Sequence, residues 1–130
     1  MMILPITLCA AAAAAAINTW LSIRVGMIRA SKKISIGDGG DMNLIARMRA
    51  HANFIENTPI VLILIATIEL ARTGNPFLLG AAAIYMLGRV AHGMGMDGGP
   101  MGFLRGPGTL ITMLTQLGLG VWAVSIVLDM

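Results

Sequence analysis

Four long apolar segments fill most of this 130-residue chain and leave little sequence between them. A helix that crosses a bilayer needs about 20 mostly apolar residues. Hydrophobic residues make up 57% of the chain and charged residues only 12%, whereas a soluble domain carries about 25% charged residues. We therefore expect an all-α integral membrane protein, with residues 1–130 forming a single four-helix transmembrane domain. The expected spans cover about residues 2–24, 42–72, 76–96 and 109–128.

Charge and residue composition exclude several classes of function. The formal net charge of +3 is small, so we expect no nucleic-acid partner. The single cysteine, Cys9, excludes an intrachain disulfide. The two histidines, His51 and His92, lie in different expected spans and belong to no HxxxH or paired-acid motif. We therefore expect no metal site.

The basic residues predict the topology. Most of them gather around the first and third connecting loops: Arg24, Arg29, Lys32, Lys33, Arg47, Arg49, Arg89 and Arg105. Because basic residues favour the cytoplasmic side, loops 1 and 3 are expected in the cytoplasm and both termini outside. The polar ends of the second and third spans then share the cytoplasmic side.

A polar stripe enters the second expected span. At 100° per residue, Arg49, Asn53 and Glu56 fall within about 60° of one another on a helix. Asn57 flanks this stripe, and His51 lies roughly opposite it. Ionisable groups at membrane depth are costly and usually mark a functional site.

A second stripe follows from the spacing of Tyr85, Arg89, His92 and Met96, which recur every three or four residues in the third span. An arginine suits a carboxylate, a glutamate suits an ammonium group, and an asparagine both donates and accepts. Together the stripes predict a site for a zwitterionic, carboxylate-bearing, peptide-like ligand. In the alternative interpretation, the arginines extend to lipid headgroups and Glu56 pairs with an arginine of a neighbouring helix.

The segment from Arg49 to Pro59 resembles a family signature, R-x-x-x-N-x-x-E-x-x-P, in the second helix of the membrane-associated proteins in eicosanoid and glutathione metabolism (MAPEG). The Gly37–Gly40 linker and the segment Gly88–His92 are similar to the bacterial branch of this family. The resemblance covers essentially the whole chain and points to members like the microsomal glutathione transferases.

This resemblance implies a homotrimer of four-helix subunits in a bacterial inner membrane, with glutathione bound as co-substrate between subunits near the cytoplasmic face. His51 would reach the glutathione from the adjacent subunit. Arg105 would stabilise the glutathione thiolate, with His92 as the second candidate. The resemblance implies that Arg29, Arg49, Asn53 and Glu56 also bind glutathione and that Asn57 and Met96 stand at ligand-contacting positions. The stripe in the third span adds Arg89 to the expected glutathione-binding residues.

The chain departs from the family pattern where many mammalian members carry tyrosines. Asn57, His92 and Met96 occupy those positions, and Tyr85 is the single tyrosine of the chain. The resemblance implies a transferase or peroxidase that acts on lipophilic electrophiles arriving from the membrane lipids. One alternative is a glutathione- or lipid-binding membrane protein without catalysis. Another is a small four-span drug exporter, although such exporters carry an essential glutamate in the first span and residues 2–24 contain no acid.

Overall fold

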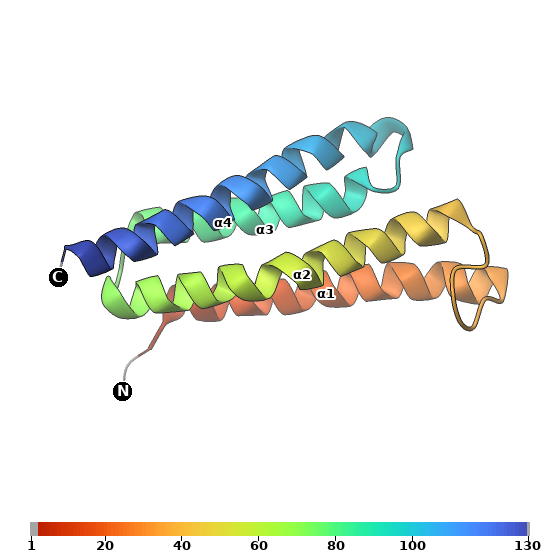
Figure 1. The fold of residues 1–130 in the computed structure, drawn as a ribbon. Helices are drawn as coiled ribbons and strands as arrows, with labels where there is room; N and C mark the ends of the chain where they lie inside the picture. The colour runs from red at the N-terminus through yellow and green to blue at the C-terminus, as the bar shows by residue number, and fades with distance from the viewer. Residues whose placement is uncertain (1–2, 130) are drawn as a thin grey trace.

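Four long helices form a bundle in which each helix runs antiparallel to the next one in the chain (Figure 1). The computed structural model describes residues 3–129. Both chain ends lie at one end of the bundle, and the α1–α2 and α3–α4 connections lie at the other (Figure 1). All four helices are long and apolar enough to cross a membrane, which confirms the predicted all-α, four-span architecture. The elements are α1 (Pro5–Lys32), α2 (Met42–Ala71), α3 (Pro76–Gly95), the 3₁₀ helix η1 (Gly99–Leu104) and α4 (Arg105–Leu128).

Three helix boundaries differ from the sequence prediction by three residues or more. The first helix was expected from about residue 2, which lies outside the described residues, but α1 begins at Pro5. The first helix was expected to end near Arg24, but α1 continues to Lys32. Arg24 is buried, and its Nη1 donates to the carbonyl of Gly93 at 2.8 Å, so this arginine packs inside the bundle. The fourth helix was expected from Thr109, but α4 begins at Arg105. Pro107 then lies in the first turn, where a missing backbone N–H costs nothing.

The helices α2 and α3 begin with side-chain caps, and α1 does not. Asp41 precedes α2 and accepts a hydrogen bond from the backbone N–H of Leu44 at 2.9 Å. Because this bond, helped by the charge of Lys32, favours the carboxylate, it holds the pKa of Asp41 below its ordinary value of 3.8. Asn75 caps α3 in the same way, through the N–H of Phe77.

At the start of α1, the preceding residue Leu4 makes no capping bond. Its role falls to Glu69, near the end of α2, whose carboxylate accepts from the N–H groups of Ile6 and Thr7 at 2.9 and 2.8 Å. The Thr7 hydroxyl adds a third bond at 2.6 Å. The charge of this buried glutamate thus lies at the positive end of the α1 dipole.

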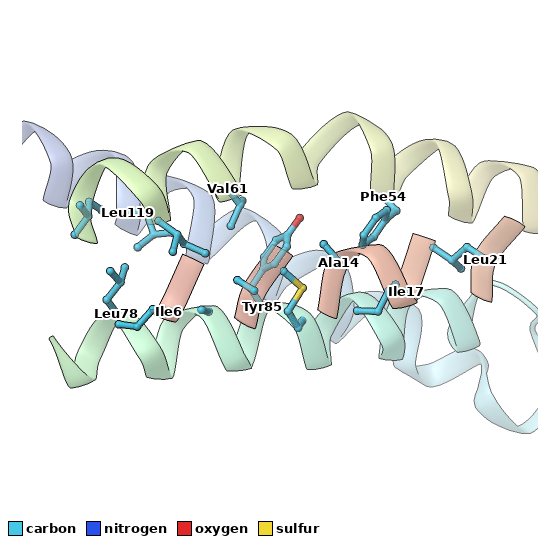
Figure 2. Close-up of a cluster of buried hydrophobic side chains, with 14 of the residues drawn as sticks. Ile6, Ala14, Ile17, Leu21, Phe54, Val61, Leu78, Tyr85 and Leu119 are labelled. Atoms are coloured by element: carbon cyan, nitrogen blue, oxygen red, sulfur yellow. The ribbon is translucent and has the colours of Figure 1, made fainter. Parts of the chain in front are cut away.

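The apolar core extends along the bundle axis, as Figure 2 shows. Alanines of α1, such as Ala10 and Ala14, are buried against the neighbouring helices. Small side chains let membrane helices approach closely. Midway along, the hydroxyl groups of Tyr85 and Thr58 are hydrogen-bonded at 3.0 Å, so the one buried phenol is satisfied. This core fixes the relative positions of α2, α3 and α4, from which the polar site is built.

Candidate functional site

The predicted stripe on α2 is presented at the molecular surface. Arg49 and Glu56 are exposed, and Asn53 lies partly buried between them. Within residues 3–129, the side chains of Arg49 and Glu56 form no hydrogen bond or ion pair with another protein group. With a rise of about 1.5 Å per residue, the two charges lie about 10 Å apart along the helix axis. Asn57 is half-buried, and its Nδ2 donates to the carbonyl of Asn53, one turn earlier in α2, at 2.8 Å.

Behind this stripe lies the buried guanidinium of Arg89, which is 1% exposed. Its Nη1 donates to Thr112 Oγ1 at 2.7 Å, and its Nη2 donates to Asn53 Oδ1 at 2.8 Å. The guanidinium also lies 5.9 Å from the centroid of the Phe54 ring. Its Nε is the one buried side-chain nitrogen or oxygen in the described part of the chain that has no hydrogen-bond partner. Arg89 therefore connects α2, α3 and α4 from inside the bundle.

His92 lies one turn further along α3 and is also buried. Its Nδ1 is 3.4 Å from Nη2 of Arg89. Because a guanidinium can only donate, Nδ1 must be the acceptor, so the ring proton is on Nε2 and the imidazole is neutral in this arrangement. In this arrangement the His92 ring carries no positive charge.

Close backbone contacts set the position of Arg105 at the start of α4. A Cβ added to Gly95 would overlap the backbone N of Arg105. A Cβ added to Gly108 would lie 2.7 Å from both the backbone N and the Cβ of His92. Glycine is required at both positions because any side chain would force α3 and α4 apart. The side chain of Arg105 is exposed.

Arg49 and Arg105 lie toward the same end of the bundle, relative to the buried guanidinium of Arg89. The helices α2 and α4 both begin at the end of the bundle that carries the α1–α2 and α3–α4 connections (Figure 1). Arg49 precedes Asn53 by one turn, and Arg105 precedes Thr112 by two turns. Both cations therefore lie toward this connection end, whereas Glu56 lies further into the bundle.

Three other predicted site residues lie away from this arrangement within the subunit. Arg29, in the last turn of α1, donates to the carbonyl of Gly37 at 2.8 Å and thereby closes the α1–α2 connection. His51 faces α1, where its Nε2 lies 2.8 Å from Asn18 Oδ1. Met96, at the end of α3, is half-buried against the core.

Sequence reasoning missed a charged cluster at the same end of the bundle. Asp97 forms ion pairs with Arg24 and with Nε of Arg47, the latter at 3.1 Å. Arg24 also stacks over the ring of Trp20, 4.6 Å from its centroid. The sequence carries no clear signal of this cluster, because Arg24, Arg47 and Asp97 lie in three separate segments of the chain. Thr112 was missed as well, because it is one of three threonines in α4, and nothing in the pattern of that helix distinguishes it from Thr109 and Thr115.

An apolar groove of about 590 Å³ lies between α2 and α4, with Ile60, Leu64 and Val121 among its lining residues. A smaller hollow of about 240 Å³ lies beside Asn57 and shares Gln116 and Leu117 with the groove. The two hollows therefore connect the polar stripe of α2 with a long apolar surface.

Residues 3–129 contain no group of three or more histidine, cysteine or acidic side chains that could hold a metal ion.

In a comparison with known protein families, residues 7–125 match the MAPEG family. No curated protein matches the chain. The family match extends over nearly all of the four-helix bundle, including the α2 stripe and the Arg89 network. The chain therefore belongs to the MAPEG family, whose functions lie generally in membrane glutathione or eicosanoid chemistry.

Proposed function

We propose that this protein is a membrane-bound glutathione transferase or peroxidase that acts on lipophilic electrophiles. Glutathione binds as co-substrate along the α2 stripe, at a subunit interface of a homotrimer. In this proposal the protein resides in a bacterial inner membrane, with the α1–α2 and α3–α4 connections in the cytoplasm, where glutathione is available. The distribution of basic residues supports this orientation.

One observation carries the proposal: Arg49 and Glu56 present opposite charges on one face of an apolar helix, and no protein group of the described chain satisfies either. A charge at membrane depth without a partner is costly. A zwitterionic tripeptide supplies a carboxylate for Arg49, an ammonium group for Glu56 and amide groups for Asn53 between them. A second copy of the chain would cover the remaining sides of the ligand, which supports the trimer.

In this proposal Arg105, an exposed arginine near the cytoplasmic end of the bundle, activates the thiol. An exposed guanidinium near a thiol favours the thiolate and so lowers the thiol pKa. In conjugation, the sulfur forms a bond to an electrophilic carbon, and the bond between that carbon and its leaving group breaks. In peroxide reduction, the sulfur attacks one oxygen and the O–O bond breaks. The departing alkoxide takes up a proton, and a second glutathione reduces the resulting sulfenic acid.

The groove between α2 and α4 supports a lipophilic second substrate. Its walls are almost wholly apolar, and its smaller extension reaches Asn57 beside the stripe. An apolar molecule dissolved in the bilayer would lose no hydrogen bonds on entering it. Its reactive end would then approach the glutathione sulfur from the membrane side, and the protein would contribute orientation.

Isothermal titration calorimetry of glutathione with the detergent-solubilised protein tests this proposal. We expect binding by the wild type and a loss of about tenfold or more in affinity for Arg49→Ala and Glu56→Gln, since each removes a charge-assisted hydrogen bond. Arg72→Ala is the matched control, because Arg72 is an exposed arginine just after the last turn of α2, at the other end of the bundle. Its affinity should equal that of the wild type.

Two outcomes bear on the alternatives. Binding without turnover of any lipophilic electrophile would favour a glutathione-binding protein, consistent with the absence of hydroxyl groups at Asn57, His92 and Met96. No binding at millimolar glutathione would refute the proposed function and leave the family membership and the four-helix architecture.

A further inference from the structure

The contacts of Arg89 differ from those of a residue that touches a ligand. Its guanidinium is buried between Asn53 of α2 and Thr112 of α4, and both hydrogen bonds are short. Among residues 3–129, no carboxylate forms an ion pair with it. A buried cation of this kind is costly unless its N–H groups are held in good geometry. A buried arginine at this position therefore calls for a role other than packing.

Arg89 determines which way the Asn53 amide points. A guanidinium has N–H donors and no acceptor, so the Asn53 atom that faces it must be the oxygen. The Asn53 nitrogen, Nδ2, then points elsewhere. Nδ2 is not among the buried atoms that lack a partner, and Asn53 itself is only partly buried. The stripe on α2 therefore presents an N–H donor between Arg49 and Glu56.

Thr112 holds Arg89 in that position. The Thr112 hydroxyl donates to the carbonyl of Gly108 at 2.9 Å, so its lone pairs remain to accept from Arg89. Gly108 in turn packs against the backbone of His92 on α3. Each hydrogen bond in this series thus has one possible direction: Arg89 donates to Asn53 Oδ1 and to Thr112 Oγ1, and Thr112 donates to the carbonyl of Gly108.

We propose that Arg89, held by Thr112, is a positioning residue that keeps the N–H groups of Asn53 turned toward the ligand. The site then selects a ligand with a carbonyl or carboxylate oxygen at that point, between its ammonium group and its terminal carboxylate. The inference rests on the proposed function, in which that ligand is glutathione, and it assigns Arg89 a role through Asn53 in place of direct contact.

The first test is Asn53→Asp, with glutathione affinity measured by calorimetry and thermal unfolding followed by circular dichroism. A carboxylate still accepts from Arg89, and it neutralises the buried cation, so the unfolding temperature should rise. It offers no N–H donor, so the affinity should fall by about tenfold or more. Unchanged or tighter binding would overturn the inference, because Asn53 would then act toward the ligand as an acceptor. Weaker binding with a lower unfolding temperature would also overturn it, since the fold itself would have been damaged.

The second test changes only the support. Thr112→Val removes the acceptor for Arg89 Nη1, so we expect a higher Kd for glutathione in the folded fraction. Thr112→Ser keeps the hydroxyl and should restore the wild-type Kd. Thr115→Val, on the same helix, is the matched control, because the Thr115 side chain makes no hydrogen bond within residues 3–129.

The results separate this inference from the proposed function. A wild type that binds glutathione, with Thr112→Val binding equally well, refutes the positioning role and leaves the proposed function standing. A wild type that does not bind glutathione refutes the proposed function and this inference with it.

Discussion

Replacing Glu69 by Gln tests how the end of the bundle opposite the candidate site is held together. The Glu69 side chain is 0% exposed, and it accepts three hydrogen bonds from the first turn of α1, two from the backbone N–H groups of Ile6 and Thr7 and one from the Thr7 hydroxyl. The first N–H groups of a helix have no partner within the helix itself. In α1, a carboxylate from α2 supplies those partners.

The expected cost follows from these contacts. Gln keeps the size of Glu69, but its amide nitrogen cannot accept a hydrogen bond, and the negative charge is lost. The oxygen lost from Oε1 or Oε2 leaves at least one buried N–H without a partner. A hydrogen bond to a charged group contributes about 1.5–3 kcal/mol, and the charge at the helix terminus contributes about 0.3–1 kcal/mol. We therefore expect Glu69→Gln to lower the free energy of unfolding by about 2–4 kcal/mol.

Amide hydrogen exchange in detergent measures this locally. Since about 1.4 kcal/mol corresponds to a tenfold change in an opening equilibrium, the Ile6 and Thr7 amides should exchange at least about tenfold faster. The control is Glu56→Gln, an identical substitution on the same helix at an exposed site without a partner in the described chain. Glu56→Gln should leave the free energy of unfolding within about 0.5 kcal/mol of the wild type and impair glutathione binding. Wild-type exchange at Ile6 and Thr7 in Glu69→Gln would refute the capping role.

Three further predictions concern the ends of the helices. Gly108→Ala should destabilise the fold and displace α4, because its Cβ would lie 2.7 Å from the His92 backbone; thermal unfolding measures this. Asp97→Asn should lower stability more in low salt than in high salt, because Asp97 pairs with two arginines. The pKa of Asp41 is lowered below 3.8 by the Leu44 N–H, so its capping contribution is complete above that value and is lost as the pH falls through the lowered pKa. Asp41→Asn should retain the cap and remove this acid dependence, measured by unfolding at a series of pH values.

Much of the fold was predictable because bilayer thickness sets the length of an apolar helix. The α2 and α3 boundaries fell within a residue of the prediction. The end of α1 was missed because Arg24 looks like the end of a span. Its partners, the Gly93 carbonyl and Asp97, lie about 70 residues away in the chain.

The candidate site was predictable only where it depends on a single helix. Helical periodicity places Arg49, Asn53 and Glu56 on one face, and the structure presents them so. Periodicity within α3 could not show that Arg89 bonds to Thr112, which belongs to α4. The Glu69 cap was equally invisible, because its partners are 62 and 63 residues away. Contacts between helices depend on packing, which a pattern within one helix does not encode.

We propose that this bundle binds glutathione and activates its thiol beside Arg105. The most direct measurement is the ultraviolet difference absorbance of the thiolate when glutathione is added to the purified, detergent-solubilised protein. Arg105→Ala and the control Arg72→Ala would be measured in parallel. We expect a thiolate signal in the wild type and in Arg72→Ala, and its loss in Arg105→Ala while glutathione still binds. A thiolate signal of wild-type size in Arg105→Ala, or its absence from a wild type saturated with glutathione, would contradict the account.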